Sequence, residues 1–204
     1  GVVARVSNDY LIGEGFSAKP KIIITPVKQV LINGHQADIS GEKDYRVVYD
    51  NGIVHNQYRN TLIAKITEMC YKDGDGVLII VNRIDHGNNI GEILAQLNVP
   101  FEFVTGDHDV DSREDSFQAM KDGHLKVLIS TSLIDEGVSI SGINSLIMAA
   151  GGKSMRQVLQ RTGRVLRKKK GGNTAKLYDF RDQTNTYMLD HAAARESIYI
   201  EEGF

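Results

Sequence analysis

An unbroken apolar run from Val77 to Val81 constrains the fold of this 204-residue chain more than any other feature. Five consecutive aliphatic side chains leave no polar face, which is typical of a strand buried on both sides of a parallel sheet. Such a sheet needs helices to cover it, and the following segment supplies one before Pro100 ends it. Its apolar positions recur at helical spacing: Ile90, Ile93, Leu94 and Leu97. The run therefore predicts an α/β fold.

The same alternation continues along the chain. Further short apolar runs span residues 101–104, 127–130, 145–149 and 177–180. Helical patterns lie over residues 62–70, before the first run, and around 113–121, 154–167 and 184–196 between or after the others. This order predicts a five-stranded parallel sheet with right-handed crossovers. Because ligands bind beyond the carboxyl ends of parallel strands, the candidate site lies in the loops after Val81, Val104, Ser130 and Ala149.

The first part of the chain lacks this periodicity. Two short β-rich pieces, residues 21–25 and 27–32, are separated by Pro26 and followed by an Asn33-Gly34 turn signal. Residues 45–49 resemble a further extended piece. We expect residues 1–54 to form an irregular, β-containing arm or connector, and residues 55–204 to form the α/β domain. The chain begins at Gly1 without an initiator Met, so we expect a processed chain or a fragment of a longer protein.

Composition excludes several classes of protein. The 24 Lys and Arg residues nearly balance the 26 Asp and Glu residues, which argues against a disordered acidic chain. A single Cys rules out a disulfide framework and fits a reducing cytoplasm. No apolar run approaches the roughly 20 residues that cross a bilayer, so we expect no membrane association.

The near-neutral total hides one strongly cationic segment. Between Lys153 and Lys176 there are nine basic residues and no acidic one, which leaves 15 basic against 26 acidic residues elsewhere. A local cationic segment on an acidic body predicts a focused anion site.

Helical geometry arranges part of that segment on two arcs. At 100° per residue, Gln160, Arg164 and Arg167 share an arc opposite the apolar side chains of the same helix. Guanidinium groups stay charged and fork onto phosphate oxygens, so this row suits a phosphate ligand. A solvated basic helix face is the alternative, and the absence of nearby carboxylates favours the anion site.

These residues carry a family resemblance. The octapeptide QRTGRVLR, residues 160–167, resembles the Q-x-x-G-R-x-x-R signature, motif VI, of superfamily 2 helicases and translocases. In the expected order before it, VLIIVNRIDHGNNI is similar to motif IV and GHLKVLISTSLIDEGVSI to the stretch through motif V. YDNGIVHNQYRN and LIGEGFSAKPKI resemble segments of recombination-type DNA helicases from phages and bacteria. The resemblance implies a RecA-like C-terminal lobe, with its parallel sheet flanked by helices.

The chain lacks the first-lobe motifs of such enzymes. We find neither the P-loop G-x-x-x-x-G-K-[ST] nor a D-E-x-x box. The nearest match is Gly151-Gly152-Lys153-Ser154, but Ile147 occupies the position that needs the first glycine. We therefore expect a tight turn there, and expect the P-loop on a first lobe that this sequence does not contain.

The resemblance implies that ATP and Mg²⁺ are held mainly by that first RecA-like lobe. Arg164 and Arg167 would act as arginine fingers on the γ-phosphoryl group, and Gln160 would support the γ-phosphate or the attacking water. The implied nucleotide-binding positions are Gly137, Ser139 and Gly163. Ser139 stands where members of the family often have Asp, so it brings a hydroxyl without the charge.

The resemblance also implies contacts with the nucleic-acid backbone, most naturally that of DNA, from the strand-end loops. The candidates are Asn82, Arg83, Gly106, Asp107, Ser130, Thr131 and Ser132. Small polar groups on phosphates fix register without reading sequence, so binding would be sequence-tolerant and salt-sensitive. His86, His108 and His124 show no metal-ligand spacing; we expect ordinary loop or surface residues and no metal site.

Three functional hypotheses follow. The first is the second motor lobe of an ATP-dependent DNA helicase, which for a phage protein would work in the bacterial host cytoplasm. The second is a helicase-shaped module that binds nucleic acid or a partner without hydrolysing ATP. The third, weaker, is a stand-alone nucleotide-binding enzyme that uses Gly151 to Ser154.

Overall fold

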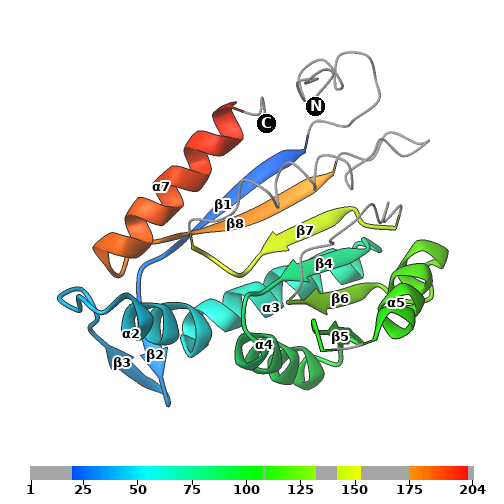
Figure 1. The fold of residues 1–204 in the computed structure, drawn as a ribbon, viewed down its shortest axis with the longest axis horizontal. Coiled ribbons are helices and arrows are strands. Elements are labelled where there is room, and N and C mark those ends of the chain that lie inside the picture. Colours follow the sequence, from blue (N-terminus) through cyan, green and yellow to red (C-terminus); the bar gives the residue numbers. More distant parts are fainter. Residues whose placement is uncertain (1–19, 108, 132–141, 153–174, 202–204) are drawn as a thin grey trace.

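A six-stranded parallel sheet forms the centre of the computed structural model, which describes residues 20–107, 109–131, 142–152 and 175–201 (Figure 1). The strand order is β1-β8-β7-β4-β6-β5, and every neighbouring pair is parallel. The strands are β1 Lys21–Val27, β4 Val77–Ile80, β5 Glu102–Val104, β6 Val127–Ser130, β7 Ser145–Met148 and β8 Lys176–Asp182. The predicted parallel α/β fold is confirmed, and so are its five predicted strands.

Helices cover both faces of the sheet. Helices α3 (Gln57–Lys72) and α4 (Ile84–Gln96) pack on one face, where Val77 and Ile79 of β4 join their core. Helices α5 (Val110–Asp122) and α7 (Thr186–Glu201) pack on the other, against Leu78 and Ile80. Adjacent residues of one strand thus enter two separate cores, which explains why β4 carries no polar position. The helix predicted over residues 154–167 lies outside the described residues.

Asn56 anchors the start of α3 and ties a small hairpin to it. The hairpin consists of β2 (Val30–Ile32) and β3 (His35–Ala37), which pair antiparallel. The Asn56 Oδ1 atom accepts from the amide of Leu31 at 3.1 Å, while Nδ2 donates to the carbonyl of Gln29 at 3.0 Å. One N-cap residue therefore fixes both the first turn of α3 and the strand beside it.

The expected break at Pro26 is wrong. Strand β1 runs through Pro26 to Val27 and pairs with β8, so part of the predicted N-terminal arm is an edge strand of the sheet. A proline lacks only its N–H donor, and an edge strand leaves one row of donors without a sheet partner. The division of the chain at residue 54 stays a prediction.

The extended piece expected at residues 45–49 is also wrong. These residues form the short helix α2 (Tyr45–Tyr49), which continues into the π-helical segment η1 (Asp50–Val54). Asp44 caps α2 by accepting from the amide of Arg46 at 2.8 Å. Val48 and Tyr49 are buried in a cluster with the hairpin and the start of α7, so packing and the cap override the β-propensity of Val and Tyr.

The expectation of a loop or surface position holds for His124 but is wrong for His86. His124 is exposed, whereas His86 lies fully buried in α4, one turn before Ile90 on its apolar face. Its Nε2 lies 3.0 Å from Asn60 Oδ1 and donates to it, because the Asn60 amide nitrogen donates to the carbonyl of Val54. Burial lowers the pKa of His86 well below its ordinary value of 6.5, so the ring is neutral. His108 lies outside the described residues.

Across the described helices, none is long and apolar enough to cross a membrane.

Candidate functional site

The strand-end loops meet along the carboxyl edge of the sheet, as the sequence predicts. The amide of Val81 after β4 donates to Ser130 of β6 at 3.0 Å, and that of Thr131 donates to Val104 of β5 at 3.2 Å. On the other side, the amide of Ala150 after β7 donates to Ile80 of β4 at 2.8 Å. Backbone hydrogen bonds therefore hold four loops in a fixed order beside one another.

Two predicted nucleic-acid residues contact each other at this edge. The amide of Gly106 donates to Thr131 Oγ1 at 3.2 Å, which joins the loops after β5 and β6. Gly106 is exposed, and a Cβ added there would meet no atom of the described residues within 4 Å. The space beside Gly106 is therefore open to a ligand. Ser130, by contrast, is fully buried at the end of β6, and its contact with nucleic acid stays a prediction.

Arg83 lies at the N-cap of α4 and is already partnered. Its Nη1 lies 2.6 Å from Asp50 Oδ1, and its guanidinium sits 5.5 Å from the centre of the Tyr49 ring. The side chain is still 44% exposed, so it reaches solvent at this edge. Exposed Asn82 precedes it and lies close to the Tyr49 hydroxyl; burial raises the pKa of Tyr49, and Asn82 is among the groups that oppose that rise. A phosphate bound at Arg83 would therefore compete with Asp50 for the positive charge of the guanidinium.

The loop after β7 forms a tight turn before the cationic segment. Gly151 and Gly152 have φ of +60° and +78°, a left-handed backbone that glycine adopts without penalty. A Cβ on Gly151 would meet Ile53 at 3.0 Å. The first two residues of the P-loop look-alike therefore have a left-handed backbone, and Gly151 packs against η1; Lys153 and Ser154 lie outside the described residues.

Two buried arginines border this loop, and sequence analysis did not identify either. Arg59 is fully buried, with its Nε 2.8 Å from Asp182 Oδ1. Arg195 is 1% exposed, with its Nε 2.8 Å from Asp179 Oδ2. Burial raises the pKa of Asp182, and the charge of Arg59 opposes that rise. The sequence held one weak sign of this burial: Arg59 lies one turn before Ile63 on the apolar face of α3. Spacing alone could not identify it, because exposed arginines also occur one turn from an apolar residue.

The remaining predicted site residues cannot be located in this structure. Ser132, Gly137, Ser139, Gln160, Gly163, Arg164 and Arg167 lie outside the described residues. Within the described ranges, no group of three or more His, Cys, Asp or Glu side chains is placed to hold a metal ion.

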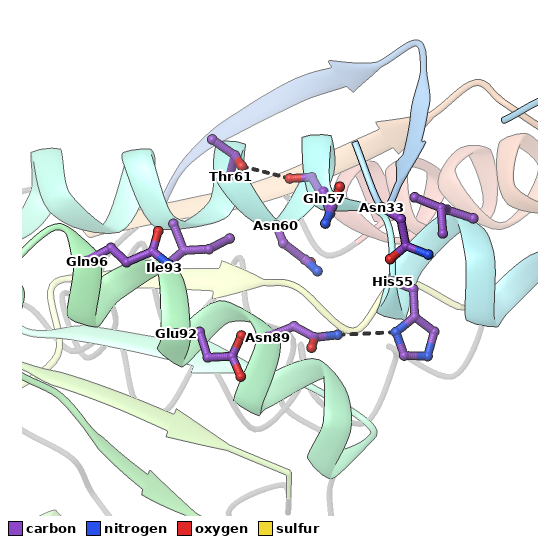
Figure 2. Close-up of a pocket in the computed structure, with 10 residues that line it drawn as sticks. Asn33, His55, Gln57, Asn60, Thr61, Asn89, Glu92, Ile93 and Gln96 are labelled. Atoms are coloured by element: carbon purple, nitrogen blue, oxygen red, sulfur yellow. Dashed lines mark hydrogen bonds between the residues drawn. The ribbon is translucent and has the colours of Figure 1, made fainter. Parts of the chain in front are cut away.

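A separate polar cavity of about 560 Å³ lies between α3, α4 and the turn of the β2–β3 hairpin (Figure 2). Its carboxamides support the fold: Gln57 Oε1 accepts from the amide of Gly34 at 2.7 Å, and Asn89 Nδ2 donates to Val54 at 2.8 Å. Asn60 has the two partners described above. Glu92 is the single carboxylate and His55 the single imidazole among the lining residues, so the cavity offers no cluster of catalytic groups.

Comparison with known proteins agrees with this architecture. The family described as helicase conserved C-terminal domain matches residues 59–169, more than half of the chain. The chain belongs to this family. The match spans α3, the strands β4 to β7 and the segment predicted as motif VI.

Individual relatives and a solved structure extend the likeness. The chain is 25% identical over 162 residues to the ATP-dependent DNA helicase uvsW of Enterobacteria phage T4, a match covering 72% of this chain and 32% of uvsW. It is 41% identical over 66 residues to the DNA 3'-5' translocase XPB2 of Sulfurisphaera tokodaii, covering 32% of this chain and 15% of XPB2. The chain thus spans a third or less of these relatives.

The crystal structure of T4 UvsW superposes with a TM-score of 0.71 at 21% identity, covering 91% of this chain and 40% of UvsW. At that identity the match shows the fold, and it confirms the predicted RecA-like C-terminal lobe. The resemblance to superfamily 2 helicases drawn from motifs IV, V and VI is confirmed by the family match.

Proposed function

We propose that this chain is the second motor lobe of an ATP-dependent DNA helicase or translocase. A first RecA-like lobe of the same enzyme would bind ATP and Mg²⁺. One observation carries the proposal: the predicted nucleic-acid loops share a sheet edge with the Gly151-Gly152 turn that leads into the motif VI segment. A single surface could therefore contact a DNA strand while presenting motif VI to a nucleotide.

The basic groups of motif VI would perform the chemistry. ATP hydrolysis supplies the free energy, and negative charge develops on the γ-phosphoryl group in its transition state. Arg164 and Arg167 would stabilise that charge, and Gln160 would support the γ-phosphate or the attacking water. An arginine finger accelerates nucleotide hydrolysis by roughly 10³ to 10⁵ where its effect is known. Gly137, Ser139 and Gly163 would border the nucleotide.

The strand-end loops would hold the DNA backbone. Asn82, Gly106, Thr131 and Ser132 offer small polar side chains and backbone amides, and Arg83 adds a charge shared with Asp50. Such groups position phosphates without reading bases, so binding would tolerate any sequence. DNA is proposed because relatives named for DNA match this chain at 25% and 41% identity. A phage origin like that of uvsW would place the enzyme in the cytoplasm of the bacterial host.

The test is ATP turnover by the full-length enzyme that contains this chain, with and without single-stranded DNA. We expect DNA to stimulate turnover of the full-length enzyme, and residues 1–204 alone to have none, because the P-loop is on the other lobe. Absence of turnover in the full-length enzyme would favour a module that binds nucleic acid without hydrolysing ATP. Turnover by residues 1–204 alone would contradict the two-lobe arrangement.

A further inference from the structure

Three side chains hold the loop that joins β7 to the motif VI segment. Arg59 Nη1 donates to the carbonyl of Ala149 at 2.7 Å, the Tyr49 hydroxyl donates to that of Ala150 at 2.7 Å, and Arg195 Nη1 donates to that of Gly152 at 3.1 Å. The three come from α3, α2 and α7, and α7 lies more than a hundred residues after the other two helices in the sequence. Three of the four carbonyls in this loop are therefore fixed from outside it.

The two arginines are themselves held in place by contacts with β8. Arg59 is bound to Asp182 and lies 4.8 Å from the centre of the Phe180 ring. Arg195 is bound to Asp179, which also accepts from the Tyr199 hydroxyl at 2.6 Å, and its Nη2 donates to the carbonyl of Phe180 at 2.7 Å. In both cases, one edge of the planar guanidinium binds β8 and another edge donates to a carbonyl of the loop. A lysine ammonium could not make both contacts with this geometry, because it is a single point of charge.

This arrangement exceeds what a surface turn requires. Burying two guanidiniums carries a large desolvation penalty, and carbonyls in a short turn can hydrogen-bond water at little cost. Gly151 and Gly152 both have a left-handed backbone, and the next residue in the sequence, Lys153, begins the segment with the predicted fingers. The three side chains therefore fix the loop that immediately precedes that segment in the sequence.

We propose that Tyr49, Arg59 and Arg195 are positioning residues for the motif VI segment. They act through the carbonyls of Ala149, Ala150 and Gly152, and none of them touches ATP. The inference rests on the proposed function, since its effect is seen in ATP hydrolysis. A displacement of about 1 Å at a reacting centre can cost roughly a hundredfold in rate, so loosening the loop would lower kcat.

The test uses Tyr49→Phe, which keeps the ring and removes only the hydroxyl. The matched control is Tyr178→Phe, because Tyr178 is also buried, at 4% exposure, but its hydroxyl lies beside Cys70 of α3. In the full-length enzyme with saturating single-stranded DNA, Tyr49→Phe should lower kcat by roughly tenfold or more. The KM for ATP, the Kd for DNA and the Tm should match those of the control.

Two further measurements keep the outcome decisive. Hydrogen exchange of the amides in residues 149–152 should be faster in Tyr49→Phe than in Tyr178→Phe. Arg195→Lys, which keeps the charge beside Asp179, should show the same selective loss of kcat if Tyr49→Phe does not fold. Equal kcat and equal exchange in Tyr49→Phe and its control would overturn the inference.

Arg167→Ala distinguishes this failure from failure of the proposed function. If Arg167→Ala abolishes turnover while Tyr49→Phe and Arg195→Lys leave kcat at the control value, only the positioning role is wrong. If the wild-type enzyme shows no turnover, or Arg167→Ala turns over normally, the proposed function fails and the positioning role fails with it.

Discussion

Replacing Arg59 with Met should destabilise this chain far more than breaking an exposed ion pair of similar length. Arg59 is 0% exposed and lies 2.8 Å from Asp182, so Arg59→Met leaves a buried carboxylate without its counter-ion. Breaking a buried pair from one side costs about 3–5 kcal/mol. The comparison is Lys72→Met, because Lys72 is 69% exposed and lies 2.7 Å from Glu68. Loss of that exposed pair should cost below about 0.5 kcal/mol.

The pH dependence and a second substitution identify the cause of the loss. Burial already raises the pKa of Asp182 against the opposing charge of Arg59, so removing Arg59 raises it further. An acid with a raised folded-state pKa loses stability as pH rises through that pKa, so Arg59→Met should cost more at pH 8 than at pH 5. Adding Asp182→Leu removes the unpaired charge and should recover about 2 kcal/mol.

Urea unfolding of the 204-residue chain measures these differences. Two results would refute this explanation. One is an Arg59→Met variant that loses no more free energy of unfolding than Lys72→Met. The other is an Arg59→Met/Asp182→Leu double variant whose loss equals the sum of the losses in the two single variants.

Three further predictions concern other sites. Burial lowers the pKa of His86 well below 6.5 in the folded chain, so on acidification His86 is protonated in the unfolded chain before it is protonated in the folded one. The free energy of unfolding therefore falls as the pH falls below about 6.5. Between pH 7.5 and 5.5 urea unfolding should show wild type losing about 1.4 kcal/mol more than His86→Gln, and parallel pH profiles would contradict this. Gly76→Ala should lower the free energy of unfolding by roughly 1–3 kcal/mol, because the added Cβ would overlap the carbonyl oxygen of Gly142. The control is Gly41→Ala, whose Cβ would meet no atom of the described residues within 4 Å. In the same unfolding assay the control should change stability by at most about 0.5 kcal/mol. Arg83→Ala in the full-length enzyme should weaken single-stranded DNA binding and reduce its salt slope by about one contact in a fluorescence titration; an unchanged slope would remove Arg83 from the interface.

The sheet could be predicted because its signal is local. Val77 to Ile80 are apolar at every position since both faces of β4 are covered, and Ile90 and Leu94 mark the buried side of α4. Strand ends of a parallel sheet share one edge, so the neighbouring positions of Gly106 and Thr131 followed from order alone.

The buried polar groups could not be predicted because their partners are distant in sequence. Arg59 and Asp182 are separated by 123 positions, and nothing local in either segment marks them as a pair. Tyr45 to Tyr49 combine aromatic and β-branched residues that favour strands, but their helix depends on the Asp44 cap and on burial of Val48 against distant elements. The break predicted at Pro26 was wrong because the effect of a proline depends on whether its strand lies at an edge of the sheet, which the local sequence does not show.

The central claim is that this lobe supplies arginine fingers to ATP bound by another lobe, and Arg167→Ala tests it most directly. The measurement is ATP turnover of the full-length variant under saturating single-stranded DNA, with its DNA affinity measured in the same buffer. The account predicts that turnover falls by roughly 10³ or more while the Kd for DNA changes by less than about threefold. Retained turnover, or equal loss of turnover and DNA binding, would contradict it.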